Sequence, residues 1–189
     1  MESKSEKQAA LEKSTKVESR IVHKGHTLDI RVDTFILKGK QRQWDVILHP
    51  GAVAILPINS DGELLLIKQW RRAAERILIE LPAGTLDAGE PPDVCAQREL
   101  QEETGYRAQE LIGLGGFFTA PGFCTEYIHF FIARELTPSY LEADDDEGID
   151  LLPVSLKLAL EMIDSGTICD AKTIAGIMRY ERWLKIHGK

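Results

Sequence analysis

Two almost wholly apolar runs dominate the middle of the chain. Gly51–Ile58 reads GAVAILPI and Glu63–Gln69 reads ELLLIKQ, and between them stands the polar tetrapeptide Asn59-Ser60-Asp61-Gly62. Asp-Gly between two apolar runs is a strong signal for a β-hairpin turn. Strands that are apolar at nearly every position are buried on both faces. The pattern therefore predicts a hairpin of two central strands.

Shorter runs on either side predict further strands and a few helices. Strands are expected at 20–24, 28–37, 43–48, 77–81, 109–119 and 126–134, with 18–49 as a separate short antiparallel unit. Helices are expected from Asp93 to about Thr104, where Gly105 fits a C-terminal cap, and at 154–164 and 171–186. Hairpins with few helices lack the regular alternation of a doubly wound sheet. The fold class is therefore expected to be α+β.

The first 17 residues differ in character from the rest. They are rich in Lys, Glu and Ser, and their few apolar positions would support at most a frayed helix. We interpret 1–17 as a mobile leader, 18–49 as the antiparallel unit and 50–189 as the main domain. At 189 residues the chain is long enough for one domain with a full core.

Composition narrows the classes of function. Hydrophobic residues make up 43% and charged residues 28%, which excludes disorder of the whole chain. The net charge of −7 argues against a general nucleic-acid binder, so an anionic ligand needs local basic groups or metal ions. No apolar run approaches the roughly 20 residues of a membrane span, and the N-terminus lacks a signal-peptide core. We expect a soluble, cytoplasmic protein that binds neither nucleic acid nor membrane.

The cysteines give no sign of a disulfide framework or a zinc cluster. Cys95, Cys124 and Cys169 are odd in number, widely spaced and without a C-x-x-C pair. We expect them to be small buried side chains.

The helix expected at 93–104 carries the most informative chemistry. Glu99, Glu102 and Glu103 are spaced at i, i+3 and i+4, so one helix face carries all three carboxylates. Their mutual repulsion would be relieved by a divalent cation such as Mg²⁺, which prefers oxygen ligands and is often shared with substrate phosphates. Arg98 could reach Glu102 or fold back to Glu90 and fix the carboxylates. Spacing alone leaves an alternative, an exposed face whose acids pair with Arg98 and solvent.

The stretch from Gly84 to Tyr106, GTLDAGEPPDVCAQRELQEETGY, resembles the Nudix box, G-x5-E-x7-R-E-U-x-E-E-x-G-U with U apolar. It matches at Gly84, Glu90, Arg98, Glu99, Leu100, Glu102, Glu103 and Gly105, with Tyr106 as a soft match. The resemblance implies a mixed β-sheet sandwiched between helices and metal-dependent hydrolysis of a nucleoside diphosphate linked to another group. It also implies that Glu99 and Glu103 bind Mg²⁺, or Mn²⁺ as a substitute, that Glu102 is a further ligand or assists catalysis, and that the Ala83 carbonyl completes a site.

Outside this box the chain resembles the ADP-ribose pyrophosphatase and nucleoside-diphosphate-sugar branch of the family. The matching features are HPGAVAILPI, Lys68-Gln69-Trp70-Arg71, Glu80-Leu81-Pro82-Ala83-Gly84, Pro121, and Cys169-Asp170-Ala171-Lys172-Thr173. The resemblance implies that Arg71 contacts the substrate diphosphate and that Glu80 lies near metal or substrate. Trp44 is a candidate for stacking on the nucleobase, with core packing as the alternative, and Asp45 is a candidate for a polar base contact.

The resemblance implies that the general base is a glutamate of a loop far along the chain, here the acidic segment 141–149, LEADDDEGI. Glu147 is the first candidate, and Glu142 and Asp145 are nearly as well placed. The catalytic set is therefore Glu147, Glu102 and Arg98.

The resemblance makes ADP-ribose the expected substrate and AMP with ribose 5-phosphate the expected products. Two alternatives stay open: another sugar nucleotide such as ADP-glucose or GDP-mannose, or a Nudix module that senses ADP-ribose without hydrolysing it. Pro121 argues against an oxidised nucleoside triphosphate as substrate. Members of the branch are commonly homodimers with exchanged N-terminal strands, and the separable unit 18–49 is compatible with such exchange.

Overall fold

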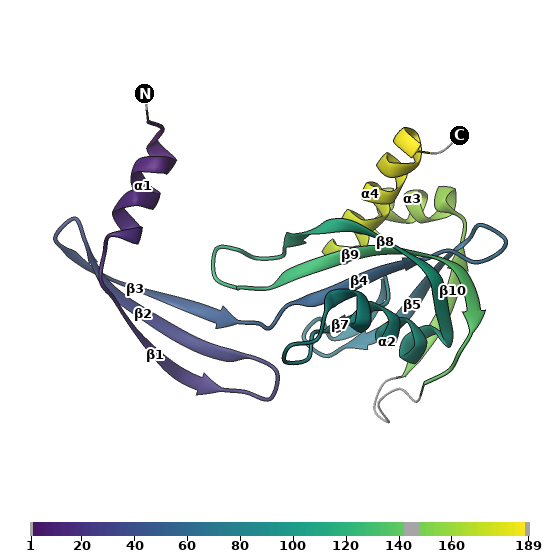
Figure 1. Cartoon of the computed structure of the whole chain (residues 1–189), viewed down its shortest axis with the longest axis horizontal. Helices are drawn as coiled ribbons and strands as arrows, with labels where there is room; N and C mark the ends of the chain where they lie inside the picture. Colours follow the sequence, from purple (N-terminus) through teal and green to yellow (C-terminus); the bar gives the residue numbers. More distant parts are fainter. Residues whose placement is uncertain (1, 142–147, 188–189) are drawn as a thin grey trace. The chain divides into compact units, whose positions relative to one another are not determined.

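The computed structural model describes residues 2–141 and 148–187 and divides them between two compact units. The first unit consists of Met1–Pro50 together with Ala120–Glu126, and the second of Gly51–Thr119 with Tyr127–Lys189. Figure 1 shows the helices and strands of each unit. No helix among the described residues is long and apolar enough to cross a membrane.

The first unit is an antiparallel sheet with one helix. Its strands β1 (Val17–Lys24), β2 (Asp29–Leu37) and β3 (Lys40–Leu48) pair in the order β1-β2-β3, which confirms the antiparallel strands expected at 18–49. The segment Ala120–Glu126 is joined to β3 by hydrogen bonds from the Ile47 amide to the Phe123 carbonyl (2.7 Å) and from the Thr125 amide to the Ile47 carbonyl (3.0 Å).

Residues near the N-terminus form more regular structure than the sequence pattern indicated. Helix α1 spans Lys4–Lys13, and a capping box joins Ser3 to Glu6 through reciprocal side-chain and backbone hydrogen bonds. Caps of this kind satisfy two of the amide donors that a helix N-terminus leaves unpaired. None of its residues is buried, so local capping rather than packing accounts for the helix.

The described residues of the second unit form two sheets and three helices. A mixed sheet has the strand order β7-β4-β9-β8, from β7 (Ala83–Thr85), β4 (Ala52–Pro57), β9 (Tyr127–Pro138) and β8 (Tyr106–Phe118). An antiparallel sheet has the order β10-β5-β6, from β10 (Ile149–Val154), β5 (Leu64–Arg71) and β6 (Arg76–Glu80). The helices are α2 (Pro92–Thr104), α3 (Leu156–Asp164) and α4 (Ala171–His187).

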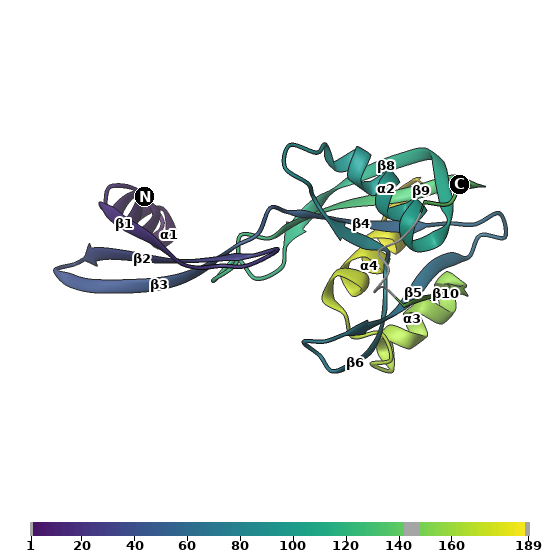
Figure 2. The same ribbon diagram turned by 90° about the horizontal axis from the view of Figure 1, so that it is seen from below.

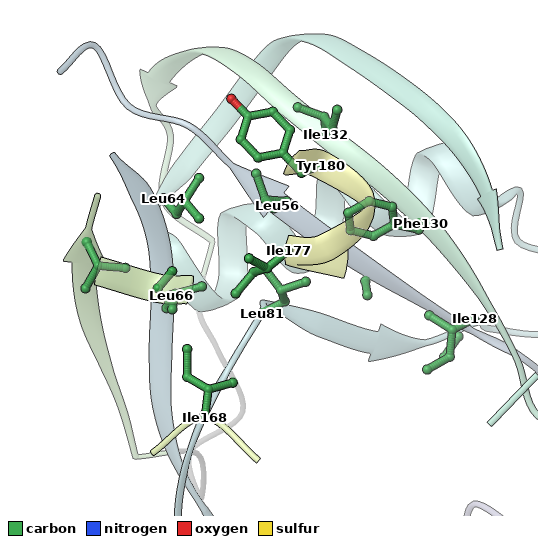
Figure 3. Packing of buried hydrophobic residues seen from close by; sticks show 14 residues of the cluster. Leu56, Leu64, Leu66, Leu81, Ile128, Phe130, Ile132, Ile168, Ile177 and Tyr180 are labelled. Carbon is green, nitrogen blue, oxygen red and sulfur yellow. The ribbon is translucent and has the colours of Figure 1, made fainter. Parts of the chain in front are cut away.

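Strand β4 explains how the mixed sheet lies between helices. Its side chains alternate between two faces: Val53 and Ile55 pack with Cys95, Ala96 and Leu100 of α2, whereas Ala54 and Leu56 pack with residues of α3, α4 and the second sheet. Figure 2 shows α2 and α4 on opposite sides of β4, and Figure 3 shows the larger cluster, in which Leu56, Leu81, Phe130 and Ile177 meet. The predicted α+β fold with a sandwiched mixed sheet is therefore confirmed.

The predicted hairpin between the two apolar runs is wrong. The turn itself forms, because the Asn59 side-chain oxygen accepts the amides of Asp61 (3.0 Å) and Glu63 (2.8 Å). Beyond a single bridge between Ile58 and Leu64, however, the two strands separate into different sheets. Both edges of β4 pair with β7 and β9, and both edges of β5 pair with β10 and β6. The strands are central, as expected, but not to the same sheet.

Two short strands and two cysteines also differ from expectation. Strand β7 lies between the strand expected at 77–81 and the helix expected from Asp93, and β10 precedes α3; no strand was expected at either place. Only Cys95 is buried, and burial raises the pKa of its thiol to about 12. Cys124 is partly exposed and Cys169 is exposed, so the expectation of three buried thiols holds for Cys95 alone.

Candidate active site

Helix α2 presents the predicted carboxylates because its apolar side chains fix its orientation. Cys95, Ala96 and Leu100 are fully buried against the mixed sheet. The helix begins after Pro91, with proline also at its first position, and ends at Gly105, whose φ of 73° is left-handed. With the helix held in this way, the side containing Glu99 and Glu103 lies against β7.

Arg98 joins three of the box carboxylates. Its guanidinium donates to Glu90 through Nε (3.1 Å) and Nη2 (3.0 Å), and through Nη1 to Glu99 (2.7 Å) and Glu102 (3.1 Å). The sequence offered Glu102 or Glu90 as partners of Arg98, and the structure has both. Hydrogen bonds from Arg98 lower the pKa of Glu90 to about 2, and those to Glu90 raise the pKa of Arg98. Arg98 thus offsets the repulsion among neighbouring acids.

The backbone of β7 fits closely around Glu99 and Glu103. A Cβ added to Gly84 would lie 1.9 Å from the Glu99 carboxyl carbon, so the carboxylate occupies the space that any side chain at 84 would need. Glu103 is only 7% exposed, and its Oε2 accepts the Ala83 amide at 2.8 Å. Glycine at the start of the box is therefore required by the approach of Glu99 to the strand.

The donor set suits a hard divalent cation. Glu99, Glu102 and Glu103 carry carboxylate oxygens within about one helix turn, and the Ala83 backbone reaches Glu103 through its amide. Among residues 2–141 and 148–187, no group of three acidic, His or Cys side chains is already arranged to hold a metal. Arg98 forms ion pairs with Glu99 and Glu102.

A second charged cluster lies at the ends of β5 and β6. Arg71 forms a bidentate pair with Glu80, Nε to Oε1 and Nη2 to Oε2, both at 2.8 Å. Burial alone would raise the pKa of Glu80, which is 1% exposed, but the hydrogen bonds from Arg71 and the charge of Lys172 keep it below its ordinary value. The hydrogen bond to Glu80 raises the pKa of Arg71, and the charge of Glu103 acts in the same direction. Arg71 therefore lies within electrostatic reach of the box.

The N-terminus of α4 completes this cluster, and sequence reasoning assigned it no role. Lys172 donates to both Glu80 and Asp170, at 3.1 Å for Asp170. Asp170 also accepts the Thr173 amide (3.0 Å) and hydroxyl (2.6 Å), and that hydroxyl oxygen accepts the buried Leu81 amide (2.8 Å). The signal available in the sequence was Asp170 three residues before Thr173, a helix-capping spacing.

The remaining predicted site residues lie elsewhere. Trp44 and Asp45 are exposed residues of β3 and Pro121 is exposed in the segment Ala120–Glu126, so all three belong to the first unit. The Trp44 ring is 50% exposed and meets Phe35 edge to face at 5.5 Å, so it packs on one side and leaves indole surface open. Glu147, with its alternatives Glu142 and Asp145, falls outside the described residues.

Comparisons with known proteins show which family the chain resembles. The NUDIX domain model matches residues 48–170. An ADP-ribose pyrophosphatase of Bacillus subtilis (strain 168) is 39% identical over 89% of this chain and 92% of its own length, and a methanol dehydrogenase activator of Bacillus methanolicus is 37% identical over 88% and 90%. A GDP-mannose pyrophosphatase of Salmonella paratyphi B is 38% identical over 71% and 78%.

A solved structure titled "Crystal structure of ADP compounds hydrolase" has the same fold. It superposes with a TM-score of 0.83 over 92% of this chain and 96% of that one, at 24% sequence identity. The matched residues include all of α2 and, from the second charged cluster, Arg71, Glu80 and Asp170. The chain therefore belongs to the Nudix family, and its relatives include ADP-ribose and GDP-mannose pyrophosphatases.

Proposed function

We propose that this protein hydrolyses the pyrophosphate bond of a nucleoside diphosphate sugar with the help of Mg²⁺, and that ADP-ribose is its substrate, giving AMP and ribose 5-phosphate. The observation that carries the proposal is that Arg98 joins Glu99 and Glu102 while Glu103 accepts the Ala83 amide, with Arg71 within reach of the charge of Glu103. A relative named ADP-ribose pyrophosphatase at 39% identity supports the choice of substrate.

Each residue has a chemical part in this proposal. Glu99, Glu103, Glu102 and the Ala83 carbonyl would hold the cation, for which Mn²⁺ can substitute. A cation held there would neutralise charge on the diphosphate and lower the pKa of an attacking water. Arg71 binds a phosphate oxygen through a planar donor pair suited to phosphate. Arg98 keeps the carboxylates in place, and Glu80 holds the Arg71 guanidinium until the diphosphate binds.

Proton transfer needs a carboxylate close to the attacking water. We propose Glu147 for this role, with Glu102 as the group that assists. Replacement by Gln removes the proton-accepting function while conserving size, so Glu147→Gln should lower kcat by about 10²-fold or more. Glu142→Gln and Asp145→Asn are the matched variants. If one of them, rather than Glu147→Gln, abolishes turnover, the assignment moves to that residue.

The proposal is tested by phosphate release in the presence of alkaline phosphatase, with Mg²⁺ or Mn²⁺ and ADP-ribose, ADP-glucose or GDP-mannose. Glu102→Gln and Glu103→Gln should abolish most of the turnover. Glu110→Gln is the control, because Glu110 is 46% exposed and pairs only with Arg134 on the neighbouring strand among the ion pairs seen in the described residues. Metal-dependent turnover retained by folded Glu102→Gln and Glu103→Gln would contradict the proposal.

The alternatives have distinct outcomes in the same assay. Preference for GDP-mannose or ADP-glucose would keep the chemistry and change the substrate, and relatives named GDP-mannose pyrophosphatase give this alternative its support. Binding of ADP-ribose by folded protein that releases no product would favour a sensor.

We propose that Trp44 stacks on the nucleobase, with Asp45 and Pro121 beside it in the substrate pocket. The half-exposed indole supplies the required aromatic face. Trp44→Ala should raise KM for ADP-ribose by about tenfold, and Trp44→Phe should restore most of the affinity. Equal effects of Trp44→Ala on ADP-ribose and on a diphosphate analogue that lacks the base would contradict stacking.

We also propose that the protein is a homodimer in which the N-terminal strands are exchanged. The first unit leaves many apolar side chains exposed for its size: Val17, Ile21, Val22, Leu28, Ile36 and Trp44. Contiguous exposed apolar surface is typical of protein interfaces. Light scattering should give a mass of about twice 21.2 kDa. A monomer at micromolar concentration would remove this part of the proposal.

A further inference from the structure

Lys172 occupies a position that is unfavourable for a lysine in two respects. It is the second residue of α4, close to the positive end of the helix dipole, where cations are disfavoured. Its side chain is only 13% exposed, although lysine is rarely buried without a partner. A residue that breaks two local rules at once is expected to have a compensating role.

The surroundings of Lys172 show what that compensation is. Its ammonium group pairs with Asp170 at 3.1 Å and also with Glu80, whose side chain is 1% exposed. Glu80 already has a complete bidentate partner in Arg71. Two cations therefore share one buried carboxylate, and one of them reaches it from the base of a helix.

One cation would be enough to keep Glu80 in place if the cluster were a structural brace alone. If Arg71 were that single cation, it could never release the carboxylate, because a buried carboxylate without a counter-ion is strongly destabilised. With Lys172 present, the four groups Arg71, Lys172, Glu80 and Asp170 sum to zero charge, and Glu80 keeps a partner when Arg71 turns away. The Arg71 side chain is 38% exposed, so it has access to solvent.

We propose that Lys172 is a positioning residue that acts through Glu80: it is the permanent counter-ion that lets Arg71 exchange its carboxylate for the substrate diphosphate. This inference depends on the proposed function, since it takes Arg71 as the residue that binds the diphosphate. Lys172 itself contacts no substrate. Its effect is to increase the fraction of molecules in which Arg71 is available, and apparent affinity scales with that fraction.

Lys172→Met conserves length and removes the charge, so Arg71 becomes the only counter-ion of Glu80 and stays paired with it. KM for ADP-ribose should rise about tenfold, with kcat within about twofold of the wild type. Lys172→Arg should restore KM because it restores the charge. Lys185→Met is the matched control, as Lys185 lies on the same helix, is 61% exposed and pairs with Glu181 at i,i+4.

A double-mutant cycle with Glu80 tests whether Lys172 acts through the shared carboxylate. In a Glu80→Gln background, Lys172→Met should cause no further rise in KM, because no buried carboxylate then holds Arg71. Calorimetric titration with α,β-methylene ADP-ribose, which is not hydrolysed, should show the same non-additivity in Kd. Melting temperatures of all variants report folding, and Lys172→Gln replaces Lys172→Met if the latter is unstable.

The outcomes separate this inference from the proposed function. Additive effects of the two substitutions, or an unchanged KM in folded Lys172→Met and Lys172→Gln, would overturn the role of Lys172 while turnover by the wild type upholds the proposed function. A loss of melting temperature with no change in KM would likewise assign Lys172 to structure alone. If the wild type neither hydrolyses nor binds ADP-ribose, the proposed function fails and this inference fails with it.

Discussion

Gly84→Ala should lower activity strongly while leaving most of the stability. The added methyl group would lie 1.9 Å from the Glu99 carboxyl carbon, whereas ordinary contact begins at about 3.4 Å, so the carboxylate must move by about 1.5 Å. The displaced atoms are the end of a flexible side chain, and the fold can therefore absorb the change. The carboxylate also has to weaken its 2.7 Å bond to Arg98. A misplacement of about 1 Å in a catalytic group can cost about 10²-fold in rate, so kcat should fall by about that factor.

The assay is Mg²⁺-dependent turnover of ADP-ribose, with urea unfolding in parallel. Gly113→Ala is the control, because its added methyl would meet the Phe131 ring at an ordinary 3.6 Å in another strand of the same sheet. We expect Gly113→Ala to keep the wild-type kcat and Gly84→Ala to keep most of the wild-type stability. If Gly84→Ala is folded and turns over at the wild-type rate, the contact between Gly84 and Glu99 has no part in placing the carboxylate.

Three further predictions concern stability. In wild type, the Glu90 carboxyl has a pKa of about 2 when folded and about 4.5 when unfolded. Its contribution to the free energy of unfolding is therefore complete above pH 4.5 and is lost as the pH falls toward 2. In an acid titration of stability, Glu90→Gln should lack this pH-dependent loss. Gly176→Ala should lower the free energy of unfolding by about 1–3 kcal/mol, since its methyl would lie 2.5 Å from Leu81 and 2.8 Å from Phe130, and an unchanged urea midpoint would contradict this. Thr173→Val should cost about 1–3 kcal/mol in urea unfolding because the buried Leu81 amide loses its acceptor, and hydrogen exchange at that amide should accelerate.

The contact between Glu99 of α2 and Gly84 of β7 depends both on sequence spacing and on tertiary packing. The spacing of Glu99, Glu102 and Glu103 is enough to place them on one helix face, because the helical period depends only on the backbone. The partners of Arg98 also lie within reach along the chain. Gly84 and Ala83, however, meet Glu99 and Glu103 only because β7 pairs with β4 while α2 packs over the same sheet.

The sequence by itself determined the elements whose signals are local. Apolar runs marked β4 and β5 as central strands, Asp-Gly marked their turn, proline and Gly105 bounded α2, and the box residues identified the Nudix family. Only the tertiary structure decided how strands pair. An apolar strand can pair with any suitable neighbour, so the predicted hairpin gave way to two sheets in which each strand has other partners.

The charged cluster at Lys172 depended on tertiary structure for the same reason. Arg71, Glu80 and Lys172 are separated by up to 101 positions in the sequence, and no period or spacing relates them. They meet because β5 pairs with β6 and because Thr173 joins the base of α4 to Leu81, the residue after β6. The electrostatic partners of a buried carboxylate are fixed by packing. For this reason the family resemblance indicated Arg71 and Glu80, but nothing in the sequence indicated that Lys172 pairs with Glu80 and Asp170.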